Sequence, residues 1–181
     1  MLNCIVYIAN KKLLIERLEM DQKKVDVLLD TMLHKDLVLA SCWRMANFFI
    51  NKGELDKAIE IIERGWLHDN SKFGDDEIEA LSHIDDGKLT MRHAGSQLPE
   101  GMKQYLKLHY EHNTHHPEHW EDVSQMPEMD IVEMCCDWHA RSVQYGTNLL
   151  EFAKIRQETR FHFPQDMFFR IIFYCNILVS S

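Results

Sequence analysis

The sequence predicts an all-α protein with a single domain. Seven glycines and four prolines are spread over 181 residues, so long stretches contain no helix breaker. Apolar residues recur three and four positions apart, as at Val25, Leu29 and Met32, and this spacing places them on one face of a helix. A chain of this length forms one hydrophobic core more readily than two. We therefore expect one domain over residues 1–181.

The apolar spacing and the helix breakers set the expected helices of the first half. A long helix covers about residues 21–50 and stops before Gly53, and a second covers residues 54–67. Asp75 or Asp76 caps a short helix that reaches about residue 84, because carboxylates are preferred at helix N-termini. A polar surface connection follows this short helix.

The second half of the chain contains three further expected helices. One begins near Pro99 and ends close to Pro117, since proline disfavours helical backbone at the residue before it. Pro127 stands in the first turn of the next helix, which runs to Gly146 or beyond. The last helix begins near Pro164 and is either a closing helix over the core or a dimer face. At helical spacing among apolar neighbours, the four tryptophans are expected in the core: Trp43, Trp66, Trp120 and Trp138.

Charge and cysteine content narrow the classes of function. The formal net charge is −9 with no run of lysine or arginine, so we expect no binding to double-stranded nucleic acid. The five cysteines form no C-x-x-C pair, and their odd number fits reduced thiols in the cytoplasm. The apolar runs at the two ends are too short to span a bilayer, so no membrane association is expected.

A stretch of histidines, residues 108–120, suggests metal ligands. Its five histidines are His109, His112, His115, His116 and His119. Imidazole together with carboxylate suits divalent Mn, Fe, Zn, Co or Ni. His109 shares an expected inward face with Met102 and Tyr105, which makes it a candidate buried ligand. His112, His115 and His119 lie on a neighbouring face of the same expected helix. From the sequence, each of them is either a metal ligand or a solvent-facing group.

Other polar residues interrupt the apolar helices. His68 and Asp69 end an apolar helix together, and burying this pair costs free energy unless it is ion-paired or bound to a metal. Asp137 lies in an apolar helix, where it either meets a cation or is buried at a cost, and Glu133 shares its face. His34 is either a ligand or a core histidine bonded to a backbone carbonyl.

The order of these residues resembles the HD-domain superfamily, helical metal-dependent enzymes named for the adjacent His-Asp pair. "HDNSK" is similar to the HD-x-x-K signature, and "HHPEHW" is similar to the double histidine of dinuclear members. The resemblance covers about residues 25–150, which implies an HD-domain-like bundle there with helical extensions at both ends. More closely, "HDNSKF", "NTHHPEHW" and "MPEMDIVEMCCDW" resemble an uncharacterised family known from bacteria and phages.

The resemblance implies a site for two divalent transition-metal ions. In the superfamily, the HD aspartate bridges two ions held by the surrounding histidines and a later aspartate. The first ion would be held by His34, His68, Asp69 and Asp137, and the second by Asp69, His109 and His116 or His115. His112 and His119 would then be outer or surface groups. The ions would be Fe, Mn, Zn, Co or Ni.

Such a site predicts a metal-dependent phosphohydrolase that acts on a nucleotide or another small phosphate ester. Lys72 and Arg141 would steady the phosphate oxygens, and the alternative for Arg141 is a surface ion pair with Glu133 or Glu151. The "GYP" element of the cyclic-dinucleotide phosphodiesterases is absent after "HHPEHWED". Two other functions stay open: an HD-like di-iron oxygenase of a small polar substrate, and a non-catalytic metal-containing binding protein. A homodimer is an open possibility for the assembly.

Overall fold

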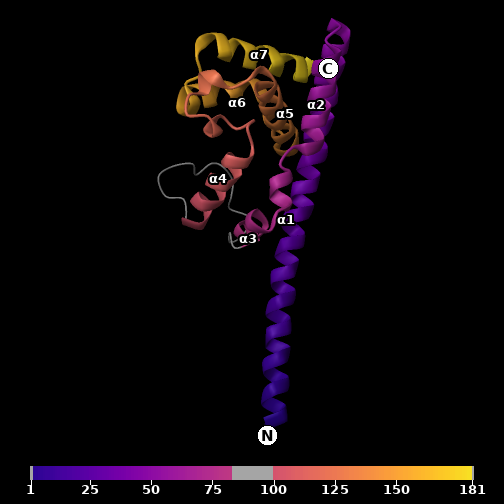
Figure 1. The fold of residues 1–181 in the computed structure, drawn as a ribbon, viewed down its shortest axis with the longest axis vertical. Helices are drawn as coiled ribbons and strands as arrows, with labels where there is room; N and C mark the ends of the chain where they lie inside the picture. Colours follow the sequence, from indigo (N-terminus) through magenta and orange to yellow (C-terminus); the bar gives the residue numbers. More distant parts are fainter. Residues whose placement is uncertain (1, 83–99, 181) are drawn as a thin grey trace.

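The described residues of the computed structural model, 2–82 and 100–180, contain helices and no strand, which confirms the all-α fold class (Figure 1). Side chains are described for most residues from Gln22 onward. The α-helices are α1 (Leu2–Lys52), α2 (Leu55–Leu67), α3 (Asp75–Ser82), α4 (Glu100–His112), α5 (Glu128–Tyr145), α6 (Leu149–Arg156) and α7 (Gln165–Ser180). The shorter elements are η1 (Asn70–Phe73), η3 (Pro117–His119), η4 (Val123–Gln125) and the π-helical η5 (Gln157–Phe161).

Helix α1 forms one long edge of the molecule, and its N-terminal part projects beyond the other labelled helices (Figure 1). It begins at Leu2 rather than near residue 21 as predicted, because residues 2–20 contain no glycine or proline to end it. It ends at Lys52, close to the predicted position. Gly53 then takes a φ of +78°, which favours glycine, and the chain reverses into α2.

Helix α2 packs closely along α1. A Cβ atom added at Gly65 would lie 2.9 Å from Cys42 Sγ and 3.2 Å from Leu39 Cδ1, so only glycine fits at this contact. Four of the described cysteines are buried, and none of them forms a disulfide: Cys42, Cys135, Cys136 and Cys175.

Helix α5 lies in the centre of the bundle. Every residue from Met129 to Cys136 is buried, because α5 contacts α1 and α2 as well as α7. Helix α7 buries Ile171, Cys175 and Leu178, so the C-terminal apolar segment covers the core. This is the first of the two alternatives that the sequence left open, although Phe169 on the outer side of α7 is 62% exposed.

The helix boundaries follow the predictions with some exceptions. The predicted end of α3 near residue 84 and most of the polar connection after it lie outside the described residues. Helix α6 was not predicted; Asn148 caps it by accepting a hydrogen bond from the Glu151 N–H at 3.0 Å. The prediction of core tryptophans holds for Trp138, which is buried, and in part for Trp120, which is partly buried against the core. It is wrong for Trp43 and Trp66, which are 52% and 65% exposed. Among the described residues, no helix combines the length and the apolar character needed to cross a membrane.

Candidate metal centre

Three separate segments bring His34, His68 and Asp137 together in the interior of the bundle. His34 comes from α1, His68 directly follows α2, and Asp137 comes from α5. One potential ligand atom from each residue lies within 4.8 Å of the other two. His34 Nε2 is 2.9 Å from Asp137 Oδ1. The structure therefore places three of the predicted ligands of the first ion around one point.

Asp69 joins this group to a second one. The residue is buried, and its backbone has a left-handed φ of 53° between α2 and η1, a conformation that aspartate tolerates better than most residues. Its Oδ2 atom is 3.5 Å from His68 Nε2, and its Oδ1 atom is 3.5 Å from His109 Nε2. Each oxygen thus faces a different imidazole, which is the arrangement required of a bridging carboxylate.

The second group consists of Asp69, His109 and His116, which again have ligand atoms within 4.8 Å of one another. His109 lies near the end of α4, and His116 precedes η3. The two Nε2 atoms are 2.9 Å apart. His115 also faces this point, since its Nε2 atom is 3.6 Å from Asp69 Oδ1. Of the two histidines that the sequence left as alternatives, the structure brings both to Asp69.

Several nitrogen and oxygen atoms at this centre are buried without a hydrogen-bonding partner. They are His68 Nε2, Asp69 Oδ1 and His115 Nε2. His34 Nε2 and Asp137 Oδ1 face only each other, at 2.9 Å. Buried polar atoms in folded proteins are nearly always paired, since an unpaired one costs free energy. These unpaired atoms come from histidine and aspartate, the residues that bind divalent metals. The donor set therefore fits a cation that accepts several lone pairs at once.

Glu133 contacts two of these imidazoles, those of His68 and His115, at their Nδ1 atoms. Its Oε1 atom accepts a hydrogen bond from His68 Nδ1 at 2.9 Å and lies 3.3 Å from His115 Nδ1. The three residues could themselves hold an ion. However, the histidine nitrogens nearest Glu133 are Nδ1, whereas both Nε2 atoms face Asp69. We therefore assign Glu133, which the sequence placed on the same helix face as Asp137, an orienting role.

Glu77 plays the same part for the histidines of α4, and the sequence did not indicate it. Its Oε2 atom accepts from His109 Nδ1 at 3.0 Å, and its Oε1 atom accepts from His112 Nδ1 at 3.1 Å. The carboxylate is fully enclosed, although it stands in the first turn of the exposed start of α3 beside Asp75 and Asp76. Acidic residues are expected in the first turn of a helix. The sequence therefore offered no reason to separate the buried Glu77 from its exposed neighbours Asp75 and Asp76.

The protonation states of the buried groups suit metal binding. Burial lowers the pKa of His34, and burial together with the neighbouring His115 lowers that of His116 well below its usual range, so both imidazoles are neutral at pH 7. Burial opposes ionisation of Asp69, but His68 and Lys72 hold its pKa well below the usual range. His115 differs: burial lowers its pKa, but the hydrogen bond and charge of Glu133 outweigh burial and raise it to about 9.

The two cations predicted to steady a phosphate group lie beside the centre. Lys72 is buried, and its Nζ atom donates to Asp69 Oδ2 at 2.7 Å. Arg141 is half-buried; its Nη1 atom donates to Gln144 Oε1 at 3.1 Å, and its charge contributes to the lowered pKa of Asp137. Within the described residues, Arg141 forms no ion pair with Glu133 or Glu151, so that alternative does not hold.

The remaining histidines of the cluster lie outside the centre, as predicted. The side chain of His112 is 52% exposed, and its contact to the site runs through Glu77. His119 Nδ1 donates to the Tyr110 carbonyl at 2.8 Å. The indole of Trp120 donates a hydrogen bond to the Thr114 carbonyl at 2.9 Å. This bond joins the residues that follow the double histidine to the residue that precedes it.

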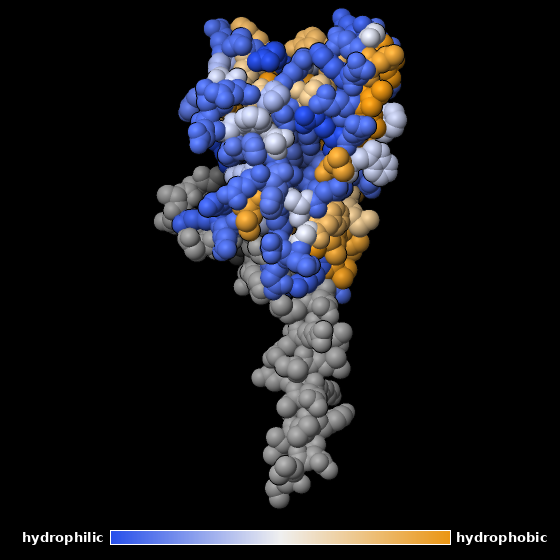
Figure 2. All heavy atoms as spheres, in the orientation of Figure 1, coloured by the Kyte–Doolittle hydropathy of each residue, from blue (hydrophilic) through white to orange (hydrophobic). Residues whose placement is uncertain are grey.

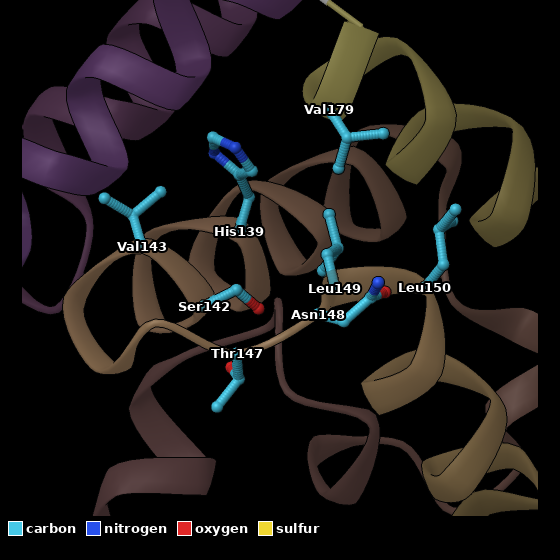
Figure 3. Close-up of a pocket in the computed structure, with 8 residues that line it drawn as sticks. All are labelled: His139, Ser142, Val143, Thr147, Asn148, Leu149, Leu150 and Val179. Carbon is cyan, nitrogen blue, oxygen red and sulfur yellow. The ribbon is translucent and has the colours of Figure 1, made fainter.

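A separate pocket of about 270 Å³ lies where α5, the start of α6 and the end of α7 meet (Figure 3). His139, Asn148 and Val179 are among its lining residues, and none of the candidate ligands is. His139 Nδ1 is 2.9 Å from Ser41 Oγ, whose hydroxyl donates to the Leu37 carbonyl. This histidine therefore links α5 to α1 and has no connection to the candidate centre.

Comparison with known proteins gives a family but no function. Neither a curated protein nor a solved structure matches the chain. Residues 23–169 match DUF5662, a family of unknown function. The matched range contains every candidate ligand and most of the chain, so the protein belongs to the DUF5662 family.

Proposed function

We propose that this protein is a metal-dependent phosphohydrolase of the HD type that acts on a nucleotide or another small phosphate ester. The observation that carries the proposal is the pair of ligand groups that meet at Asp69, where several buried nitrogen and oxygen atoms have no hydrogen-bonding partner. The ordered resemblance of the motifs to the HD-domain superfamily supports the same reaction class.

The residues present would hold two divalent ions. The first would be held by His34, His68, Asp69 and Asp137, and the second by Asp69, His109 and His116, with His115 as a further donor. Two such ions supply an activated water at neutral pH and stabilise the attacking and leaving oxygens of an in-line displacement. A mixed imidazole and carboxylate set favours Mn, Fe, Zn, Co or Ni over calcium.

The chain's own cations would bind the phosphate group. The Lys72 ammonium is fixed beside Asp69, where it can donate to a non-bridging oxygen next to the bridging carboxylate. Arg141, whose positive charge acts on Asp137, would offer a second positive charge from α5. These local charges are needed because the chain has a net charge of −9, which repels a phosphate ester overall.

The test is phosphate release from a panel of nucleotides and sugar phosphates, with protein supplied with Mn, Co, Zn or Mg. Wild-type protein should release phosphate only with metal. Asp69→Asn keeps the size of the side chain but removes the bridging charge, and should lower the rate by at least about 100-fold. The matched control is His119→Gln, which changes an imidazole outside the centre and should keep the wild-type rate.

Two outcomes would overturn the proposal. Undiminished phosphate release by Asp69→Asn would assign the activity to another site or to a contaminant. Tightly bound iron with substrate-dependent oxygen consumption, and no phosphate release from any member of the panel, would favour the oxygenase alternative instead.

A further inference from the structure

A stripe of exposed apolar side chains runs along α1 and α2. Its members are Val25, Leu29, Met32, Trp43 and Ile50 on α1 and Leu55, Ile59 and Trp66 on α2, each between 45% and 65% exposed. The opposite sides of the two helices face α5, since His34 of α1 contacts Asp137 and Arg64 of α2 contacts Asp130. Figure 2 shows apolar residues gathered over the α1 edge of the molecule. The stripe therefore lies on the outer face of the α1–α2 pair.

The spacing on α1 is that of a helix that packs against another long helix. Val25, Leu29 and Met32 are four and three residues apart, and Trp43 and Ile50 are seven apart. Residues at this spacing form a straight seam along a supercoiled pair of helices. Two polar residues, Gln22 and Asp36, fall on the same seam. A polar residue within such a seam commonly fixes the register of the pair.

The amount of exposed apolar surface is that of a stable interface. Eight large side chains, each about half exposed, present roughly 800 Å² of surface, which is what each partner buries in a protein complex of standard size. Contiguous apolar patches on monomeric proteins are usually limited to a few hundred Å². Two of the eight are tryptophans, the residue most enriched where binding energy concentrates.

We propose that a second copy of this chain covers the stripe, with the two α1 helices antiparallel and the two-fold axis near Leu29. In this arrangement Leu29 meets its equivalent and Val25 meets Leu33, which is itself 54% exposed, so the contacts nearest the axis are apolar. Further out, Met32 meets Asp26, and the amide of Gln22 meets the carboxylate of Asp36. A parallel pair would place Asp36 against Asp36 and bury like charges. The interface uses the same surface of both copies, as a two-fold dimer requires.

The arrangement also accounts for the shape of α1. This helix has 51 residues, and its N-terminal part projects beyond the rest of the described chain (Figure 1). Long helices in water gain most of their stability from packing against other elements. With the axis near Leu29, the projecting part of each copy extends along the Trp43 and Ile50 half of the other copy, next to the α2 part of the stripe.

The first test is the mass of the full chain in solution, measured by sedimentation equilibrium at micromolar concentrations. Wild-type protein should have twice the chain mass of 21.5 kDa. Leu29→Glu places two carboxylates at the axis and should raise the dissociation constant at least about 100-fold. The control is Phe169→Glu on α7, which is equally exposed but lies outside the stripe and should stay dimeric. A monomeric wild-type protein, or a Leu29→Glu variant that is still dimeric with unchanged helix content, would overturn the proposal.

Cysteine cross-linking tests the antiparallel direction. The variants carry Cys4→Ser; the other cysteines, Cys42, Cys135, Cys136 and Cys175, are buried. Leu29→Cys should form an intermolecular disulfide on oxidation. Trp43→Cys should not, because at 1.5 Å per residue its two copies lie about 40 Å apart along the helices. Cross-linking of both variants would show a parallel pair, and cross-linking of neither would overturn the assigned axis.

Discussion

Glu77 accepts a hydrogen bond from His109 Nδ1 at 3.0 Å, and this contact leaves His109 Nε2 facing Asp69 and His116. The two residues come from helices on either side of the segment that the structure does not describe. The same carboxylate holds His112 through its other oxygen. Carboxylates behind ligand histidines fix the ring orientation and strengthen the metal bond.

Replacing Glu77 by Gln should therefore weaken binding of one ion. Glutamine offers one acceptor oxygen for two histidines, so one of the two hydrogen bonds is lost. We expect the dissociation constant of the more weakly bound ion to rise about 10- to 100-fold, as measured by competition with a chelator. Asp76→Asn is the control, because Asp76 is exposed on the same helix. Equal affinities of Glu77→Gln and wild-type protein would rule out the orienting role.

Metal affinity should depend on pH through His115. The pKa of His115 is raised to about 9, so its imidazole is protonated at pH 7 in the metal-free protein. A metal ion that takes the Nε2 lone pair must displace this proton. The affinity should then rise by up to about tenfold per pH unit from pH 7 to 9 and level off above it. His115→Gln should flatten the slope; a wild-type affinity that is equal at pH 7 and 9 would show that His115 does not bind the ion.

Arg64 should make a large contribution to stability. Its Nη1 atom lies 2.8 Å from Asp130 Oδ1 and 3.2 Å from Glu133 Oε2, and both carboxylates are buried. Arg64→Met leaves Asp130 without its cation and removes one of the positive charges beside Glu133, and we expect the free energy of unfolding in urea to fall by about 3 kcal/mol at pH 7. Lys57→Met removes pairings with Glu54 and Glu128, whose side chains are 43% and 39% exposed, and should cost less than about 1 kcal/mol. Similar losses for both variants would contradict this account.

The close contact of α2 with α1 should not tolerate a methyl group. In Gly65→Ala the new Cβ would lie 2.9 Å from Cys42 Sγ, so one helix must shift. We expect a loss of about 1–3 kcal/mol in the free energy of unfolding, despite the better helix propensity of alanine. Glu63→Ala, at an exposed position of the same helix, is the control for an alanine that meets no close neighbour. A Gly65→Ala variant as stable as Glu63→Ala would show that α1 and α2 can move apart at this contact without loss of stability.

The sequence indicated the candidate ligands because they violate the pattern around them. Asp137 and His34 stand among apolar residues, where a polar group needs a partner, and His68 and Asp69 do so as a pair. Glu77 could not be found this way, since acids are expected at the start of a helix. The role of Glu77 depends on the packing of α3 against α4. The sequence between these two helices has no apolar periodicity from which this packing could be predicted.

The sequence predicted the helices better than it predicted what covers them. Periodicity shows that one face of a helix is apolar but not which element packs on it. Trp43 and Trp66 were therefore expected in the core, whereas the structure leaves both exposed. Helix α6 was missed because its 8 residues contain little more than two helical turns of pattern.

Metal content tests the central claim most directly. Protein purified without added metal or chelator should contain about two equivalents of transition metal by elemental analysis, and His109→Ala should contain one or fewer because it removes a ligand of one ion only. Mostly Mn, Zn or Ni would accord with hydrolysis, and mostly iron with oxygen chemistry. Wild-type protein that holds no metal, even after incubation with these ions, would contradict the two-metal centre.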